Sequence, residues 1–135
     1  MKLKKILDRQ TFDLLDRNYG NGLENADIGA MTYVNTGDNK KKSNVKLVIK
    51  MIDSEGKHLN LIFEEVWSVN HDMDLNTFRN EETNEPLFKK GLGQVDGFHI
   101  DYVDRNYLIS IITYEDYRLI ISAKKFKIET GHVWD

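Results

Sequence analysis

The chain has 135 residues, a net charge of −3 and no cysteine. This length suits a single domain spanning residues 1–135, and the lack of thiols excludes a disulfide scaffold, a thiolate zinc site and a cysteine nucleophile. Apolar runs reach only about five residues, far short of the roughly 20 that cross a bilayer, so we expect a soluble, cytoplasmic protein with no membrane partner.

Charge is distributed unevenly along the chain. Residues 1–50 carry ten basic and six acidic side chains, whereas residues 51–104 carry four basic and twelve acidic ones. The acidic middle argues against a nucleic-acid partner, because nucleic acids require a basic surface over their phosphates. Charged side chains on solvated loops are the simplest explanation, but an acidic surface can also speed the encounter with a charged partner.

The first predicted element is a helix that ends near residue 18. Leu3, Leu7 and Leu14 recur at helical spacing, which indicates an amphipathic helix, and Gly20 supplies a stop signal. The sequence also allows a break near Asp8, because aspartate is a good N-cap residue.

The next part of the chain has the alternation of antiparallel strands. The first three strand candidates are residues 27–34, 45–53 and 58–70. A Ser-Glu-Gly turn joins the last two as a hairpin, in which Gly56 can take a positive φ. In the third candidate, Trp67 shares a face with apolar neighbours, so we expect its ring in the core.

Three further strand candidates, residues 97–103, 107–114 and 117–129, are joined by short turns. The middle one has apolar residues on both faces, which predicts a central strand covered on both sides. Helices do not alternate with strands, so a parallel α/β fold is excluded. We predict a mainly β protein, an antiparallel sheet or β-sandwich of about six strands with one N-terminal helix; an α+β fold is the alternative.

Residues 71–94 separate the two sets of strands and show no regular period. Irregular segments of this length are uncommon in compact domains and are often functional. Apolar side chains ringed by charged ones are typical of a protein-binding hot spot. The residues predicted to bind a partner are Asp72, Asp74, Glu81, Glu82, Glu85 and Phe88. The alternative is a loop whose aromatic side chains pack on the core.

The start of this segment has part of the pattern of a calcium-binding loop, because Asp72, Asp74 and Asn76 place oxygen atoms at alternate positions. The sixth position is Thr77, where such loops require glycine, and the twelfth is Thr83, which cannot supply a bidentate carboxylate. We therefore expect no metal site and no cofactor.

His99 and Asp101 lie two residues apart in an alternating run, so a strand places both on one face. They could serve as a general base and its orienting carboxylate in a hydrolase-like enzyme, or they could simply be the solvated face of a strand. No nucleophile elbow or phosphate-binding loop accompanies the pair. We favour the solvated face and do not expect an enzyme.

A further alternative is a small-ligand or carbohydrate-binding β module in which aromatic rings form a stacking platform. The tyrosines flank predicted turns, where a ring packs and its hydroxyl reaches water, so a structural role is favoured. The candidate aromatic residues are Tyr33, Trp67, Tyr102, Tyr107, Tyr114, Tyr117 and Trp134.

The closing segment, residues 97–129, reads GFHIDYVDRNYLISIITYEDYRLIISAKKFKIE. It resembles the C-terminal part of small all-β bacterial immunity proteins, which neutralise polymorphic or contact-dependent toxins. Many of these end in such strands with a final Phe-x-Ile-Glu-type segment, here Phe126 to Glu129. The resemblance implies a non-enzymatic inhibitor that binds one cognate toxin domain, often through an acidic surface, and it transfers no site residue.

Overall fold

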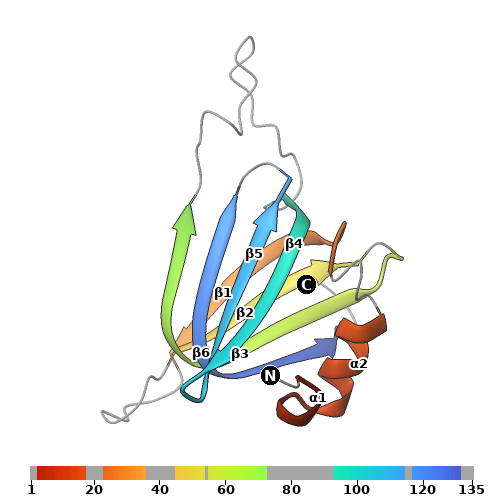
Figure 1. The fold of residues 1–135 in the computed structure, drawn as a ribbon. Coiled ribbons are helices and arrows are strands. Elements are labelled where there is room, and N and C mark those ends of the chain that lie inside the picture. Colours follow the sequence, from red (N-terminus) through yellow and green to blue (C-terminus); the bar gives the residue numbers. More distant parts are fainter. Residues whose placement is uncertain are drawn as a thin grey trace.

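Two short helices precede six strands in the part of the chain that the computed structural model describes, which is residues 3–17, 23–35, 45–53, 55–72, 93–114 and 117–131 (Figure 1). The helices are α1 (Leu3–Ile6) and α2 (Arg9–Arg17). The strands are β1 (Asp27–Asn35), β2 (Val45–Ile52), β3 (His58–Asp72), β4 (Gly93–Val103), β5 (Asn106–Thr113) and β6 (Arg118–Thr130). The prediction of a mainly β fold with an N-terminal helix is confirmed.

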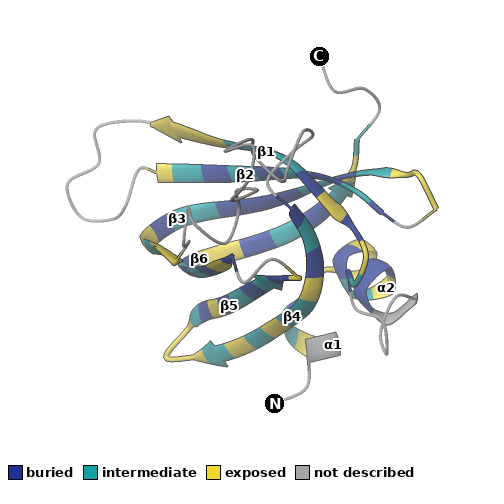
Figure 2. Ribbon diagram, turned by 90° about the horizontal axis from the view of Figure 1, so that it is seen from above, coloured by how far each residue is buried: buried dark blue, intermediate teal, exposed yellow. Residues whose placement is uncertain are grey.

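All six strands form one antiparallel sheet in the order β1-β2-β3-β6-β5-β4, and this sheet closes as a barrel. Figure 2 shows the same order from one side of the barrel to the other. The meanders β1-β2-β3 and β4-β5-β6 are joined through a long pairing of β3 with β6. Closure is brief by comparison, because β1 pairs with β4 through Asp27 and Ile28 alone. The predicted sheet of about six strands is therefore correct, and it closes on itself.

The strands β3 and β6 both curve strongly as they pass from one half of the barrel to the other (Figure 1). Glu65 of β3 has a φ of 51°, and the β3–β6 register slips between Val66 and Ser68, which leaves Trp67 as the extra residue of a bulge. A bulge changes which side chains face inward. Val66 is consequently buried while Trp67 is 51% exposed. The prediction that Trp67 lies in the core is wrong for this reason.

The core fills the inside of the barrel with the inward-facing residues of each strand. In β5 this face holds Tyr107, Ile109 and Ile111, all buried. The other face is not covered, since Leu108 is 43% exposed. Among the described elements, α2 packs against β6 and not over β5. The prediction that this strand is covered on both sides is therefore wrong.

Two of the hairpin turns have the backbone geometry that their residues favour. Gly56 has a φ of 86°, as predicted, and the Asp53 carboxylate accepts hydrogen bonds from two backbone amides of that turn at 2.9 and 2.8 Å. Between β4 and β5, Asp104 and Arg105 have φ of 53° and 63°. Two successive positive φ values define a two-residue turn of the kind that matches the twist of antiparallel strands.

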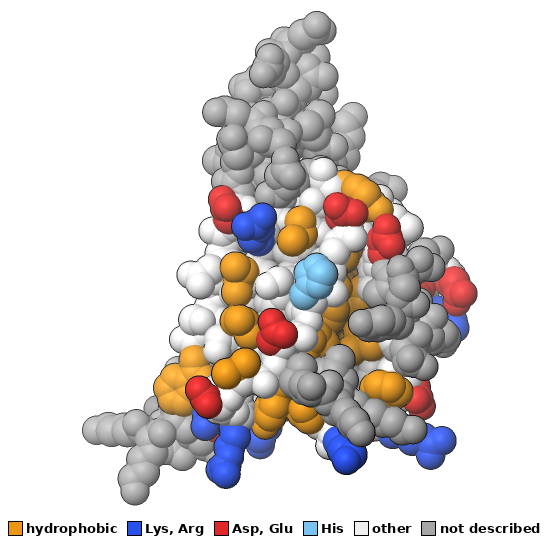
Figure 3. Space-filling view, in the orientation of Figure 1, with side chains coloured by type: hydrophobic (Ala, Val, Ile, Leu, Met, Phe, Trp, Pro, Cys, Tyr) orange, Lys and Arg blue, Asp and Glu red, His pale blue; other side chains and the backbone are white. Residues whose placement is uncertain are grey.

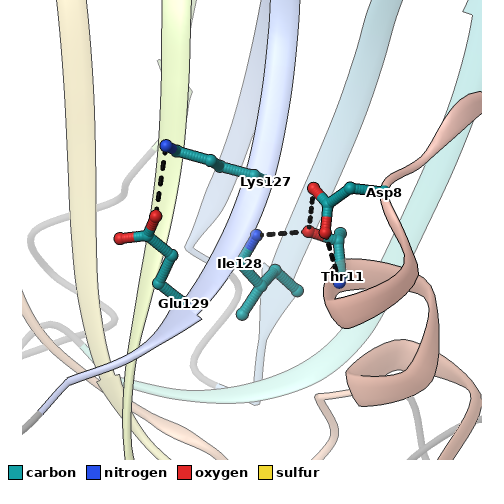
Figure 4. Close-up of polar contacts among 5 residues, drawn as sticks. All are labelled: Asp8, Thr11, Lys127, Ile128 and Glu129. Atoms are coloured by element: carbon teal, nitrogen blue, oxygen red, sulfur yellow. Dashed lines mark hydrogen bonds and ion pairs between the residues drawn. The ribbon is translucent and has the colours of Figure 1, made fainter.

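A short chain of hydrogen bonds holds α2 on β6 (Figure 4). The Asp8 carboxylate accepts bonds from the backbone N and the hydroxyl of Thr11, both at 2.9 Å, so Asp8 is the N-cap of α2. The Thr11 hydroxyl oxygen in turn accepts the backbone N–H of Ile128 at 2.8 Å. Ile128 lies in the part of β6 that pairs with β3 but not with β5. The buried Thr11 hydroxyl therefore satisfies an amide at the edge of the sheet.

Replacing Thr11 by valine should lower the free energy of unfolding by about 1–3 kcal/mol, because the near-isosteric side chain leaves the buried Ile128 amide without an acceptor. Thr11→Ser keeps the hydroxyl and is the matched control, with a smaller expected loss. Urea denaturation followed by circular dichroism measures both variants. Equal losses would contradict the role assigned to the hydroxyl.

Candidate functional site

The outer face of the β3–β6–β5–β4 sheet carries a group of apolar side chains that the fold leaves in contact with solvent. Strand register places Ser68, Ser122, Leu108 and Asp101 in one outward row across these four strands. Trp67 bulges out next to Ser68. Figure 3 shows hydrophobic side chains gathered on this face with acidic side chains among them. The members of this outer patch are Trp67, Val103, Leu108, Ile112 and Ile120.

The register also explains why the isoleucine and leucine side chains of the patch are neighbours. Ile120 of β6 pairs with Ser110 of β5 in the row next to Leu108, so Ile120 and Leu108 are diagonal neighbours. Ile112 stands diagonally from Ile120 in the following row. Diagonal neighbours on one face of a sheet lie within reach of one another. The small serine side chains between them leave the apolar groups accessible.

His99 and Asp101 lie on this same outer face, and both are exposed, as the favoured interpretation predicted. His99 pairs with Ser110 and Asp101 pairs with Leu108. The His99 ring covers Gly97, because a Cβ atom at Gly97 would lie 3.7 Å from the His99 Nε2 atom. Within the described residues, no hydrogen bond joins His99 to Asp101. The two side chains form the β4 border of the outer patch.

The residues predicted to bind a partner fall mainly outside the described part of the chain. Asp72 is described: it ends β3, is exposed, and pairs with Arg118 at a corner of the outer face. The others, Asp74, Glu81, Glu82, Glu85 and Phe88, lie outside the described residues, as do Thr77 and Thr83 of the calcium-loop comparison. Their roles stay predictions.

The aromatic residues considered for a stacking platform do not lie together. Trp67 is on the outer face, whereas Tyr107 and Tyr117 are buried on the inside of the sheet. Tyr107 packs against Phe126, with ring centroids 6.1 Å apart. Trp134 lies outside the described residues. Among the described rings, Tyr107 and Tyr117 belong to the core, whereas Tyr33, Trp67 and Tyr114 are about half exposed.

Three polar side chains from β1, β3 and the residue before β6 converge in an arrangement that sequence spacing did not predict; Tyr33 and His71 are exposed and Tyr117 is buried. The His71 Nε2 atom lies 3.0 Å from the Tyr33 hydroxyl oxygen, and the His71 Nδ1 atom lies 2.6 Å from the Tyr117 hydroxyl oxygen. The Tyr117 hydroxyl also donates to the sulfur of Met31 at 3.8 Å. We call Tyr33, His71 and Tyr117 the Tyr–His–Tyr cluster. It ties β1 and β3 to the residue that precedes β6.

Neutral phenols suit this arrangement. Burial raises the pKa of Tyr117, and the charge of neighbouring Tyr33 raises it further. Burial also raises the pKa of Tyr33. Because the Tyr117 hydroxyl donates its one proton to Met31, it accepts from the His71 Nδ1 atom, and the Tyr33 hydroxyl donates to the His71 Nε2 atom. The cluster is therefore a satisfied hydrogen-bonded cross-link between strands.

A small cavity of about 210 Å³ lies beside the start of α2. Ligand pockets usually exceed about 300 Å³. The lysines at its wall are already paired, since Lys125 Nζ lies 3.7 Å from a Glu65 carboxylate oxygen and Lys127 Nζ lies 3.1 Å from a Glu129 carboxylate oxygen. Glu129 raises the pKa of Lys127. These contacts describe a solvated ion-pair region.

No group of three or more His, Cys, Asp or Glu side chains within the described residues is placed to hold a metal ion. None of the helices that these residues form is long and apolar enough to cross a membrane.

Raising the pH above about 10 should destabilise the fold through its tyrosines. Because the folded-state pKa of Tyr117 is raised above its ordinary value of 10.0, its contribution to stability is present below that pH and is lost as pH rises through the folded-state pKa. Tyr117→Phe should lower the free energy of unfolding by about 1 kcal/mol at neutral pH, through loss of its hydrogen bonds. It should also reduce the further loss between about pH 8 and about pH 11.

Urea denaturation at the two pH values measures both effects. Tyr102→Phe is the control, because the Tyr102 ring packs against Tyr107 while its hydroxyl makes no hydrogen bond to another described residue, so this substitution should cost less at neutral pH. An unchanged alkaline loss in Tyr117→Phe would contradict the assignment.

Comparison with known proteins gives one likeness of fold and no likeness of function. No protein-family model matches the sequence, and no curated protein matches it. The crystal structure of an uncharacterized protein from Neisseria gonorrhoeae is similar, with a TM-score of 0.57 and 17% sequence identity over 78% of this chain and 91% of that chain. At this identity the match shows that the two proteins share a fold.

Proposed function

We propose that this protein binds another protein through the outer patch, and that it is an immunity-type inhibitor that neutralises a bacterial toxin by direct binding. The observation that carries the proposal is the exposed apolar centre of the outer face, where Trp67 is 51% and Leu108 43% exposed. Contiguous apolar groups rimmed by polar ones mark protein-interaction sites.

The position of Trp67 supports this use of the face. A β-bulge aims a side chain away from the direction that strand alternation would give it. In this chain the bulge turns an indole ring outward, beside Ser68 and Ser122, whose short side chains leave the ring accessible. Tryptophan is one of the residue types enriched at binding hot spots.

The charges on the β4 side of the patch favour a basic partner. Residues 93–104 contain Asp96, Asp101 and Asp104 and neither lysine nor arginine. All three aspartates are exposed; at the opposite corner of the face, Asp72 pairs with Arg118, so that corner carries both signs of charge. Acidic groups at the rim of an interface speed encounter with a basic surface and disfavour acidic competitors. A toxin that acts on nucleic acid presents such a basic surface, because its substrate is a polyanion.

Trp67→Ala should weaken binding of the partner at least about 30-fold, which corresponds to the roughly 2 kcal/mol typical of a tryptophan hot spot. The partner to test is the product of the adjacent upstream gene, by co-purification and calorimetry. Val34→Ala is the matched control: Val34 is 42% exposed but lies on β1, away from the patch. Charge reversal at Glu81 and Glu82 separately tests the acidic segment, residues 71–94, that the sequence predicts to bind a partner.

The proposal is lost if no neighbouring gene encodes a secreted toxin and nothing co-purifies. Binding that withstands Trp67→Ala and falls only on charge reversal would move the site from the outer patch to the acidic segment.

A further inference from the structure

One edge of β4 has no partner strand over most of its length in the described structure. On one side β4 pairs with β5 as far as Val103. On the other side it meets β1 only through Gly93 and Gln94. Among the described elements, neither helix packs against β4. Residues 97–103 of β4 therefore have one edge that no other described strand pairs with, which we call the free edge; in Figure 1 it lies on the side of β4 away from β5.

The hairpin geometry identifies the backbone groups at that edge. The pair that flanks a two-residue turn is hydrogen-bonded, and hydrogen-bonded pairs alternate with unbonded ones along an antiparallel ladder. Val103 flanks the turn, so Val103, Asp101 and His99 direct their amides and carbonyls toward β5. Phe98, Ile100 and Tyr102 direct theirs away from β5, toward the free edge.

The side chains on the two sides of this edge differ in character. On the inner side, Phe98, Ile100 and Tyr102 pack against the core but are only partly buried. On the outer side, His99 and Asp101 are exposed and border the outer patch. A strand added here would bury apolar side chains inside and place polar ones beside Asp101 outside, following the two-residue period of a strand.

We infer that the free edge of β4 pairs with an extended segment of the partner, in which basic side chains alternate with apolar ones. This inference rests on the proposed function, because the added strand would continue the outer face that carries the patch. Strand addition to an exposed sheet edge draws its affinity from main-chain hydrogen bonds and its specificity from alternate side chains.

Charge decides between a basic partner and a second copy of this chain. Two copies paired edge to edge would bring the aspartates of β4 near those of a second β4. Like charges directly opposite each other across strands are destabilising, whereas opposite charges stabilise. Charged residues on an edge strand guard against self-association. Asp96 and Asp101 therefore disfavour a dimer and favour lysine or arginine on the incoming strand.

Backbone amide exchange followed by NMR tests the pairing without altering the protein. The probe is a nine-residue peptide of alternating lysine and valine, and its control is the same peptide with glutamate in place of lysine. With the basic peptide, exchange of the Phe98, Ile100 and Tyr102 amides should slow by at least about tenfold. The His99 and Asp101 amides should be protected with or without it, because they bond to β5.

Ile100→Pro provides the matched genetic test. Proline removes an edge amide but leaves the bonds to β5, and it is tolerated on an edge strand. Ile100→Ala loses a similar amount of side chain and keeps the amide. Ile100→Pro should weaken peptide binding at least about tenfold more than Ile100→Ala, and circular dichroism verifies that both variants are folded.

Three results would overturn the inference. The first is an unchanged exchange rate at the three edge amides of the protein when the basic peptide is added. The second is equal protection of these amides by both peptides. The third is protection of these amides in the protein without peptide, which would indicate a second copy at the edge. Each leaves the proposed function standing, since that proposal is decided by the neighbouring gene product and Trp67→Ala. Conversely, if no partner co-purifies, the amide-exchange result with the basic peptide still decides whether the β4 edge can pair with a strand.

Discussion

The pairing of β3 with β6 is the constraint on which the remaining structure depends. It is the longer of the two pairings that join the three-stranded meanders, and it spans both halves of the barrel. Both strands must curve to do this, and the positive φ of Glu65 together with the bulge at Trp67 accommodates the curvature. The same irregularity that lets the barrel close also places an indole ring outside it. A requirement of the fold thus produces the main feature of the candidate binding surface.

The strands of the barrel differ in length, so parts of β6 and β4 extend beyond their neighbours and have an unpaired edge. These two edges differ in what covers them. The last part of β6 extends beyond β5, and α2 covers it: the Thr11 hydroxyl, held by Asp8, accepts the Ile128 amide. The corresponding free part of β4 has no such cover among the described elements. It carries exposed aspartates instead. A covered edge is closed to every partner, whereas a charged edge discriminates among partners, and this difference underlies the assignment of β4 as the pairing edge.

Sequence patterns predicted the features that depend on local chemistry, which are the strands, a turn and a helix cap. They missed the features that depend on how strands distant in the sequence pair with one another. Alternation located the strands to within a few residues, and Gly56 and Asp8 marked a turn and a helix cap because their preferences are local. Trp67 was misplaced because alternation persists through a bulge when read from sequence alone. The Tyr–His–Tyr cluster was missed because His71 lies 38 residues from Tyr33 and 46 from Tyr117. After the bulge, His71 falls in phase with the inward-facing Val69, which was the one available signal.

The outer patch and the β4 edge meet at Asp101, which stands in one row with Leu108 and also borders the free edge. The two surfaces nonetheless bind through different interactions: the outer patch through apolar side chains, and the β4 edge through main-chain hydrogen bonds. Side chains such as Trp67 supply affinity through desolvation, and substituting them leaves the backbone at the edge unchanged. The edge offers hydrogen bonds to any extended chain, so its selectivity must come from Asp101 and its neighbours. A partner that uses both must present a strand and an apolar surface side by side, which is a stricter requirement than either alone.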